Sequence, residues 1–135
     1  MYSNILVPIA LDHEHPTGPS FDIAKRLLED GGTITALHVM EELPAYVTQQ
    51  LEKGMREKQH ADFEAALKAE VADIPGAKAA LIMGHSGRSI LEFAKANNSD
   101  CIVIASHRPG LQDYLLGSTA ARVVRHAQCA VHVLR

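Results

Sequence analysis

A Gly-Ser-Thr triplet, Gly117-Ser118-Thr119, opens a segment of helical periodicity near the carboxyl end of the chain. Glycine lets a backbone approach a bulky group closely, and two hydroxyls together with the first N–H groups of a helix can donate to an anion. Residues 117–128 include no acidic residue, and they include the basic residues Arg122 and Arg125. The triplet therefore predicts an anion site, most naturally for phosphate, with an ordinary helix cap as the alternative.

The residues just upstream offer a second set of polar groups. Ser106, His107 and Arg108 follow an apolar run that ends at Ala105. An arginine can supply a full charge and paired hydrogen bonds to a phosphate. These residues predict further contacts to the same anion, with a solvent-facing Arg108 as the alternative.

A polar tetrapeptide, Asp12-His13-Glu14-His15, holds two histidines and two carboxylates, which are common metal ligands. It lacks a rigid spacing such as HExxH and precedes Pro16, so a polar loop is the favoured interpretation. A Mg²⁺ ion carried by nucleotide phosphates is the better metal hypothesis, with Asp12 as its outer-shell partner. No Ser-His-Asp or Cys-His arrangement can be recognised from spacing, so no catalytic residue is predicted.

Five short apolar runs, most of them nearly continuous, must position these groups. Continuous runs are typical of strands that are covered on both faces in a parallel sheet. The predicted strands are Asn4–Ala10, Thr33–Met40, Lys78–Met83, Cys101–Ala105 and Cys129–Leu134.

Helical patterns lie between the predicted strands. The predicted helices are Ser20–Glu29, Ser86–Ala96 and Ser118–His126, with Gly31-Gly32 as the stop of the first and Ser86 as the cap of the second. A long charged segment runs from Ala45 to Asp73, and we expect Gly54 to divide it into a looser front piece and a firm helix from about Arg56. Strict alternation of strands and helices predicts an α/β fold with one doubly wound, five-stranded parallel sheet between helices. Ligands bind such sheets beyond the carboxyl ends of the strands, where the strand order switches.

Composition and charge narrow the class of protein. Of the 135 residues, 47% are hydrophobic and 21% are charged, which is typical of a globular domain. A formal net charge of -3 gives no field that attracts nucleic acid or an anionic membrane, so neither is expected as a partner. We expect no membrane span, no signal peptide and no disulfide framework, because the sequence has no long apolar run, no basic and apolar leader pattern and only two cysteines. We expect a single cytoplasmic domain over residues 1–135, with Cys101 and Cys129 as buried, inert thiols.

Several strings of residues are similar to those of one protein family. They are Asn4–Pro8 (NILVP), Leu37–Val39 (LHV), Ile102–Ser106 (IVIAS), His107-Arg108-Pro109, Tyr114–Ser118 (YLLGS) and Val123–Arg135 (VVRHAQCAVHVLR). Together they resemble the universal stress proteins from the first predicted strand to the last residue. The Ser-His-Arg-Pro and Tyr-Leu-Leu-Gly-Ser strings are closest to the F and G type members of enterobacteria, a nucleotide-binding branch.

The resemblance implies a Rossmann-like sheet of strand order 3-2-1-4-5 that binds an adenine nucleotide, ATP, ADP or AMP, with Mg²⁺ as an optional companion. By matching position, the adenine and ribose would be enclosed by Pro8, Ile9 and the backbone of Ala10, with Asp12 in place of the family's carboxylate. The adenine would be hydrogen-bonded by the backbone of Val39. The ribose and first phosphates would be lined by Ala105, Ser106, His107 and Arg108, and the outer phosphates by Gly117, Ser118 and Thr119. Strand-end packing is the alternative for Pro8 and Val39.

The chain departs from the family's nucleotide-binding motif, Gly-x2-Gly-x9-Gly-[Ser/Thr]. Ala105 and Arg108 stand at the first two glycine positions, and eight residues instead of nine separate Arg108 from Gly117. Ala10 stands where the family usually has an acidic residue. The preferred hypothesis is a stress-response module that binds a nucleotide with little or no catalysis. A nucleotide-free structural or chaperone-like dimer and a slow ATPase are the alternatives.

The last predicted strand carries a partner hypothesis. A strand at the edge of a sheet has unpaired backbone groups that favour pairing with another chain. In the family that the chain resembles, the last strand pairs with its twin across a two-fold axis. The resemblance therefore implies a homodimer through Val131, His132, Val133 and Leu134.

Overall fold

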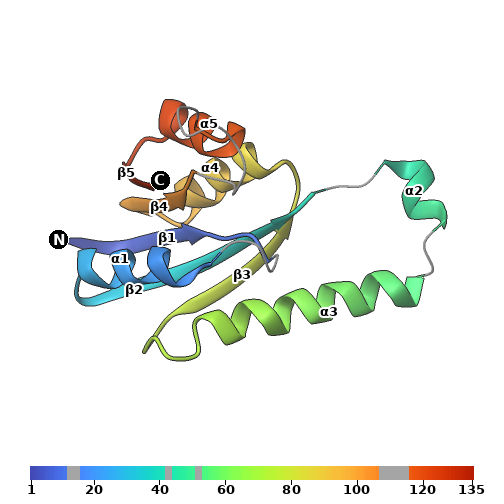
Figure 1. Cartoon of the computed structure of the whole chain (residues 1–135), viewed down its shortest axis with the longest axis horizontal. Helices are drawn as coiled ribbons and strands as arrows, with labels where there is room; N and C mark the ends of the chain where they lie inside the picture. The colour runs from blue at the N-terminus through green and yellow to red at the C-terminus, as the bar shows by residue number, and fades with distance from the viewer. Residues whose placement is uncertain (12–15, 42–43, 51–52, 107–115) are drawn as a thin grey trace.

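Figure 1 shows a parallel sheet with helices on both faces, in a computed structural model that describes residues 1–11, 16–41, 44–50, 53–106 and 116–135. The strands are β1 (Tyr2–Pro8), β2 (Leu28–Met40), β3 (Lys78–Met83), β4 (Cys101–Ala105) and β5 (Ala130–Leu134). The helices are α1 (Gly18–Leu27), α2 (Ala45–Gln50), α3 (Lys53–Glu70), α4 (Ser86–Ala96) and α5 (Ser118–His126). The strand order β3-β2-β1-β4-β5 confirms the predicted doubly wound topology. Within the described ranges, none of the helices combines the length and the apolarity that crossing a membrane requires.

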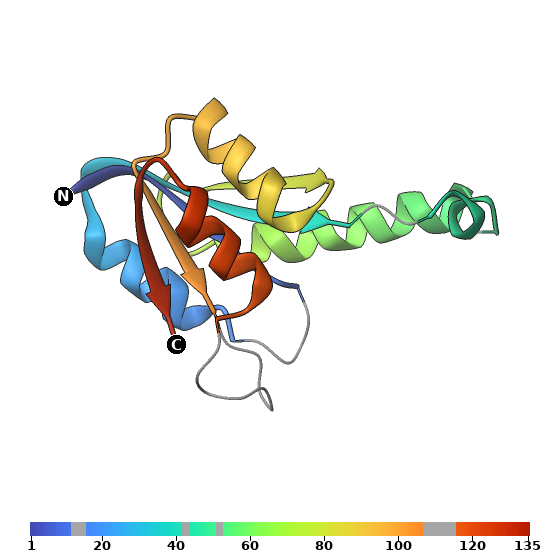
Figure 2. The same cartoon turned by 90° about the horizontal axis from the view of Figure 1, so that it is seen from above.

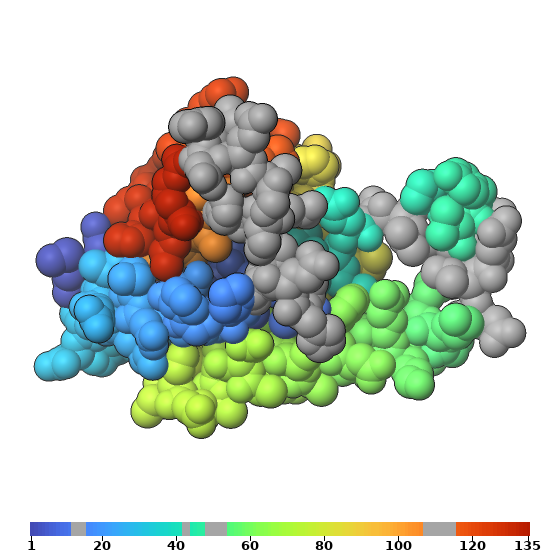
Figure 3. All heavy atoms as spheres, in the orientation of Figure 1, coloured from blue at the N-terminus to red at the C-terminus, as the bar shows by residue number. Residues whose placement is uncertain are grey.

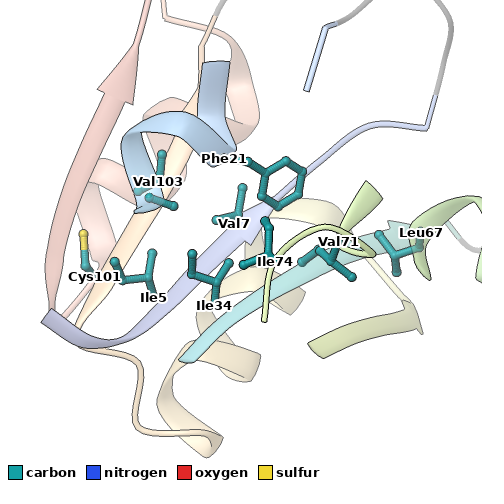
Figure 4. Packing of buried hydrophobic residues seen from close by; sticks show 11 residues of the cluster. Ile5, Val7, Phe21, Ile34, Leu67, Val71, Ile74, Cys101 and Val103 are labelled. Atoms are coloured by element: carbon teal, nitrogen blue, oxygen red, sulfur yellow. The ribbon is translucent and has the colours of Figure 1, made fainter. Parts of the chain in front are cut away.

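The continuous apolar runs of the strands are explained by burial on both faces of the sheet. Ile5 and Val7 of β1 pack into a cluster with α1 and α3, where Phe21 lies against the sheet (Figure 4). Leu6, between them, packs on the opposite face into a cluster with α4 and α5 that includes Val123. Burying each such side chain contributes about 1.5–3 kcal/mol, so alternate residues of one strand stabilise both helical layers.

Strand β2 begins earlier than the sequence predicts. The predicted helix Ser20–Glu29 ends at Leu27, and Leu28 already pairs with Tyr2 of β1. The register then shifts, and the next pair joins Asn4 to Thr33. Gly31-Gly32, expected to stop the helix, instead lies inside this irregular part of β2.

The glycines allow that irregularity for steric reasons. Gly31 has a φ of 82°, a conformation that side chains rarely adopt. A Cβ on Gly32 would lie 2.6 Å from Leu28 Cδ1 and 3.0 Å from the Ser3 carbonyl oxygen. The pair therefore accommodates the extra residues of β2 beside β1, a long-range constraint that a local pattern does not reveal.

Helix α3 extends well beyond the sheet (Figures 1 and 3). It begins at Lys53, so Gly54 lies in its first turn and does not divide the segment as predicted. Residues 54–62 are exposed on every side of the helix, and burial starts at Phe63 and becomes complete at Leu67. The charged segment thus forms two helices, α2 and α3, that are divided before Lys53 and not at Gly54. Helix α3 is held at its carboxyl half.

Strands β1 and β4 join the two halves of the sheet by a short ladder. Two register pairs connect them, Ile5 with Cys101 and Leu6 with Ile102. Each of the other neighbouring strand pairs has five or six. Beyond Leu6 and Ile102, both strands continue toward the carboxyl edge without a register pair between them, which leaves room there for a cavity.

At the opposite, amino edge, Asp100 ties the two strands together. Its carboxylate accepts hydrogen bonds from the Ser3 amide (2.8 Å), the Ser3 hydroxyl (3.0 Å) and the Asn4 amide (3.0 Å). The Asp100 amide in turn donates to the Asn4 carbonyl at 3.0 Å. Burial raises the pKa of the Asp100 carboxyl, but the hydrogen bonds from Ser3 and Asn4 together outweigh it and hold that pKa below the ordinary value of 3.8.

The Asp100 contacts generate a prediction on stability. Because folding lowers this pKa, the charged carboxylate stabilises the fold at neutral pH, and the contribution is lost as the pH falls through the folded-state pKa. We expect Asp100→Asn to lower the free energy of unfolding by about 1 kcal/mol at neutral pH, and by less near pH ~3, in urea titrations.

Asp22→Asn is the matched control. The Asp22 carboxylate is exposed, and within the part of the chain that the structure describes its partner is Lys25, in a helix-surface ion pair of 3.4 Å. We expect this substitution to change the free energy of unfolding by less than Asp100→Asn at neutral pH. Equal effects of the two substitutions at both pH values would contradict the role of Asp100.

Candidate functional site

A cavity of about 390 Å³ opens at the carboxyl edge of the sheet, where the β1–β4 ladder has ended. Figure 2 shows β1 and β4 leading to this edge, beside the beginnings of α1 and α5. Its described lining comes from the ends of β1, β2 and β4 and from the starts of α1, α4 and α5. The volume falls within the roughly 300–1,000 Å³ of small-molecule sites, and the position is the switch point at which doubly wound sheets bind ligands.

The structure brings together most of the residues that the sequence nominated. The cavity is lined by Pro8, Ile9, Ala10, Val39, Ala105, Ser106, Gly117, Ser118 and Thr119. Three nominated residues, Asp12, His107 and Arg108, lie outside the described residues. Contact of any of the twelve with a nucleotide stays a prediction.

Three helices of at least nine residues begin at this cavity. Thr17 and Ser20 line it at the start of α1, Ser86 at the start of α4, and Ser118 at the start of α5. A helix N-terminus carries a partial positive charge and N–H groups without helical partners. The parallel topology places these three helix ends at one edge, which favours an anionic ligand there.

The start of α5 offers the clearest set of donors. The Gly117 amide donates to the Ser106 carbonyl at 3.0 Å, and the Gly117 carbonyl accepts from Ala121 at 2.9 Å. Within the described residues, the amides of Ser118, Thr119 and Ala120 have no hydrogen-bond acceptor. These three N–H groups belong to a first helical turn that lines the cavity.

The structure explains the glycine at position 117 by its contact with the end of β4, whereas the sequence suggests close approach to a bound anion. A Cβ at this position would lie 3.1 Å from the Ser106 carbonyl oxygen. The glycine therefore lets α5 approach the end of β4 closely. Its backbone conformation, with φ −57° and ψ 153°, is open to other residues, so the close contact and not the dihedral angle favours glycine.

The Ser106 hydroxyl donates a hydrogen bond within the protein. The side chain is buried, its amide donates to the Leu134 carbonyl at 2.8 Å, and its hydroxyl donates to the same oxygen at 3.1 Å. The hydroxyl proton is thus committed to β5, and only oxygen lone pairs are left for a ligand. Ser106 joins the end of β4 to β5 at the floor of the cavity.

His38 positions the segment that follows β1. Its Nδ1–H donates to the Ile9 carbonyl at 2.9 Å, and the Ile9 amide donates to the Leu37 carbonyl at 2.8 Å. On the α3 side, the imidazole lies 5.3 Å from the Phe63 ring at a tilt of 57°. Ile9, which lies beyond the end of β1, is therefore held against β2 by backbone and side-chain contacts together.

Sequence reasoning missed part of the lining, including Thr17, Ser20, His38 and Ser86. The sequence predicts Ser86 as a helix cap. The structure has His85 at the N-cap position, and the Ser86 hydroxyl donates to Glu41 Oε1 at 3.1 Å. The signal was topological, because every helix that follows a strand of a parallel sheet begins at the carboxyl edge.

The described lining has little charge of its own. His38 is its only titratable side chain. No group of three or more His, Cys, Asp or Glu residues that could hold a metal occurs in the described part of the chain.

Burial, the Cys129 thiol and Asp100 raise the pKa of Cys101 to about 11, and burial and Asp100 also raise the pKa of Cys129. Neither cysteine lines the cavity.

Comparison with known proteins identifies the family. The family model described as "Universal stress protein family" matches residues 1–135. Universal stress protein G of Escherichia coli O157:H7 is 27% identical over an alignment of 142 residues that covers 100% of both chains.

Solved structures share the fold. Universal stress protein UspA from Lactobacillus plantarum superposes with a TM-score of 0.79 at 24% identity, over 99% of this chain and 98% of that one. A universal stress protein in complex with cAMP superposes with a TM-score of 0.70 at 15% identity, over 99% of this chain and 97% of that one. A universal stress protein family protein from Arabidopsis thaliana with AMP bound superposes with a TM-score of 0.64 at 17% identity, over 98% of this chain and 90% of that one. On the match of the family model to residues 1–135, the chain belongs to the universal stress protein family.

Proposed function

We propose that this protein binds an adenine nucleotide in the carboxyl-edge cavity and acts as a regulatory module in a stress response. The observation that carries the proposal is the start of α5, where the amides of Ser118, Thr119 and Ala120 have no acceptor within the described residues and line the cavity. Adjacent backbone donors at a helix N-terminus suit the oxygens of a phosphate.

The rest of the lining fits the other parts of a nucleotide. Ile9, Val39, Ile90 and Ile104 supply apolar surface of the kind that encloses a base. No carboxylate stands among the described lining residues to repel phosphates. Two proteins of the same fold were crystallised with AMP and with cAMP, which supports an adenine nucleotide as the ligand.

Each part of the nucleotide is assigned to a different group of lining residues. The base would lie between the ends of β1 and β2, near Pro8, Ile9, Ala10 and Val39. The ribose would lie at Ala105 and Ser106, and the phosphates at Gly117, Ser118 and Thr119. Asp12, His107 and Arg108 keep the roles that the resemblance implies, Asp12 in place of the family's carboxylate and His107 and Arg108 at the ribose and first phosphates. Mg²⁺ would arrive with the phosphates.

Binding can be tested by removing one backbone donor. Gly117 has the extended conformation that precedes proline readily, and Ser118 is the first helical residue, where proline is tolerated. Ser118→Pro should preserve the fold while removing an N–H group that faces the phosphates. We expect this variant to bind ATP at least about tenfold more weakly than the parent, as measured by isothermal titration calorimetry.

Ser118→Ala is the matched control, because it removes the hydroxyl and keeps the amide. We expect it to weaken ATP binding less than Ser118→Pro does. Circular dichroism would confirm that both variants fold. A parent protein that shows no heat and no thermal shift with millimolar ATP, ADP or AMP would overturn the proposal and favour the nucleotide-free alternative.

We further propose that catalysis is not the main role. ATP hydrolysis needs a group that orients or deprotonates the attacking water. The described lining supplies no carboxylate for this purpose, and Ala10 stands after β1 where the family usually has one.

Hydrolysis is tested by phosphate release at saturating ATP and Mg²⁺. We expect a turnover well below about 1 per second, which is the low end of ordinary enzymes. A turnover above that value, reduced in Ser118→Pro in parallel with ATP affinity, would show that the protein is an ATPase.

We also propose a homodimer through β5. This strand lies at one end of the strand order and pairs with β4 on one side. Peptide groups of successive residues point to opposite edges of a strand, and the Leu134 carbonyl points to β4, where it accepts from Ser106. Val131 and Val133 therefore direct their backbone groups to the free edge, where a second β5 can pair with them.

Val133→Pro tests the dimer because it removes an N–H group from the free edge and none from the β4–β5 ladder. We expect size-exclusion chromatography with light scattering to return a dimer for the parent and a monomer for this variant. Val133→Thr keeps the amide and the branched shape, so it should stay dimeric. A monomeric parent at micromolar concentration would contradict the proposal.

A further inference from the structure

We infer that Ser86 and Glu41 form a device that selects a base with an exocyclic amine, as in adenine, over a base with a carbonyl at the same position. This inference rests on the proposed nucleotide site and assigns its base specificity. Ser86 lines the cavity together with Val39 and Ile90, at the end of the cavity formed by β2 and α4. Its hydroxyl lies 3.1 Å from Glu41 Oε1.

The hydrogen bond fixes the direction of the Ser86 proton. An ionised carboxylate has no proton and can only accept, so the hydroxyl must donate to Glu41. A hydroxyl has one proton and two lone pairs. Once the proton is committed to Glu41, Ser86 can offer only acceptor lone pairs to a ligand in the cavity.

A tight turn holds Ser86 in this place. The Gly84 amide donates to the Met40 carbonyl at 2.9 Å, which joins the end of β3 to the end of β2, next to Glu41. Gly84 has a φ of 149°, and a Cβ there would lie 2.4 Å from Ser89 Oγ. The turn therefore depends on glycine, and it brings the first residue of α4 against the residue that follows β2.

The consequence concerns the two kinds of purine. The exocyclic amine of adenine donates, and an acceptor-only oxygen can receive it. Hypoxanthine and guanine carry a carbonyl oxygen at that position, which would face the Ser86 lone pairs with no proton between them. Leaving two acceptors opposed in a partly enclosed site costs binding, so the pair should disfavour ITP and GTP relative to ATP.

The test compares ATP with ITP, whose base has a carbonyl in place of the exocyclic amine and a proton on the neighbouring ring nitrogen, where adenine has a lone pair. We expect the parent to bind ATP about tenfold or more tightly than ITP in calorimetric titrations. Glu41→Gln should reduce this ratio toward one, because a glutamine amide can donate to Ser86 and release the hydroxyl proton for the carbonyl of ITP. Ser86→Ala should reduce the ratio by weakening ATP.

Glu92→Gln is the matched control. Glu92 is an exposed carboxylate of α4 that does not line the cavity, so the variant makes the same change of net charge away from the lining. We expect it to keep the ATP-to-ITP ratio of the parent. Circular dichroism and thermal unfolding would show that all three variants fold.

Three failures can be told apart. A parent that binds ATP, with an ATP-to-ITP ratio that neither Glu41→Gln nor Ser86→Ala changes, would overturn the base-selecting role and leave the nucleotide site in place. A parent that binds neither nucleotide would overturn the proposed function and this inference with it. A ratio that falls equally in Glu92→Gln would assign the effect to net charge and reject the pair.

Discussion

Strands β1 and β4 are neighbours that pair only near their amino ends, and the cavity depends on this limit. The Asp100 carboxylate and two register pairs hold the amino ends together, while the crossover helices on either side leave in opposite directions. Beyond Leu6 and Ile102 the strand ends are free to line a space instead of a ladder. A longer ladder would bring β1 and β4 together where the cavity lies, and a shorter one would separate the two halves of the core.

Much of the fold follows from local sequence. The apolar runs around Ile5 and Ile102 lack alternation because both faces of the sheet are covered, and the alternation of strands with helices leaves few topologies to consider. The start of β2 could not be predicted in this way. Leu28 continues the helical pattern of the residues before it, and only its pairing with Tyr2, far away in sequence, makes it extended.

The candidate site shows the same division between local and long-range information. Ile9, Val39 and Gly117 line the cavity; the sequence nominates Ile9 and Val39 through the resemblance to the family, and Gly117 through the Gly-Ser-Thr triplet that opens a helix. The partners of polar groups were not predictable. The Ser106 hydroxyl is committed to Leu134 and the Ser86 hydroxyl to Glu41, and both partners come from segments that meet only in the folded sheet.

Helix α3 leaves its first two and a half turns in solvent while Phe63 and Leu67 anchor the remainder. Because residues 54–62 are exposed, a turn added among them would leave the packing of Phe63 and Leu67 unchanged and would move the far end of the helix by about 5.4 Å. Packing therefore places little constraint on the side chains between Gly54 and Asp62. An epitope, a fluorophore or a linker grafted there would report on the molecule from a distance without entering its core.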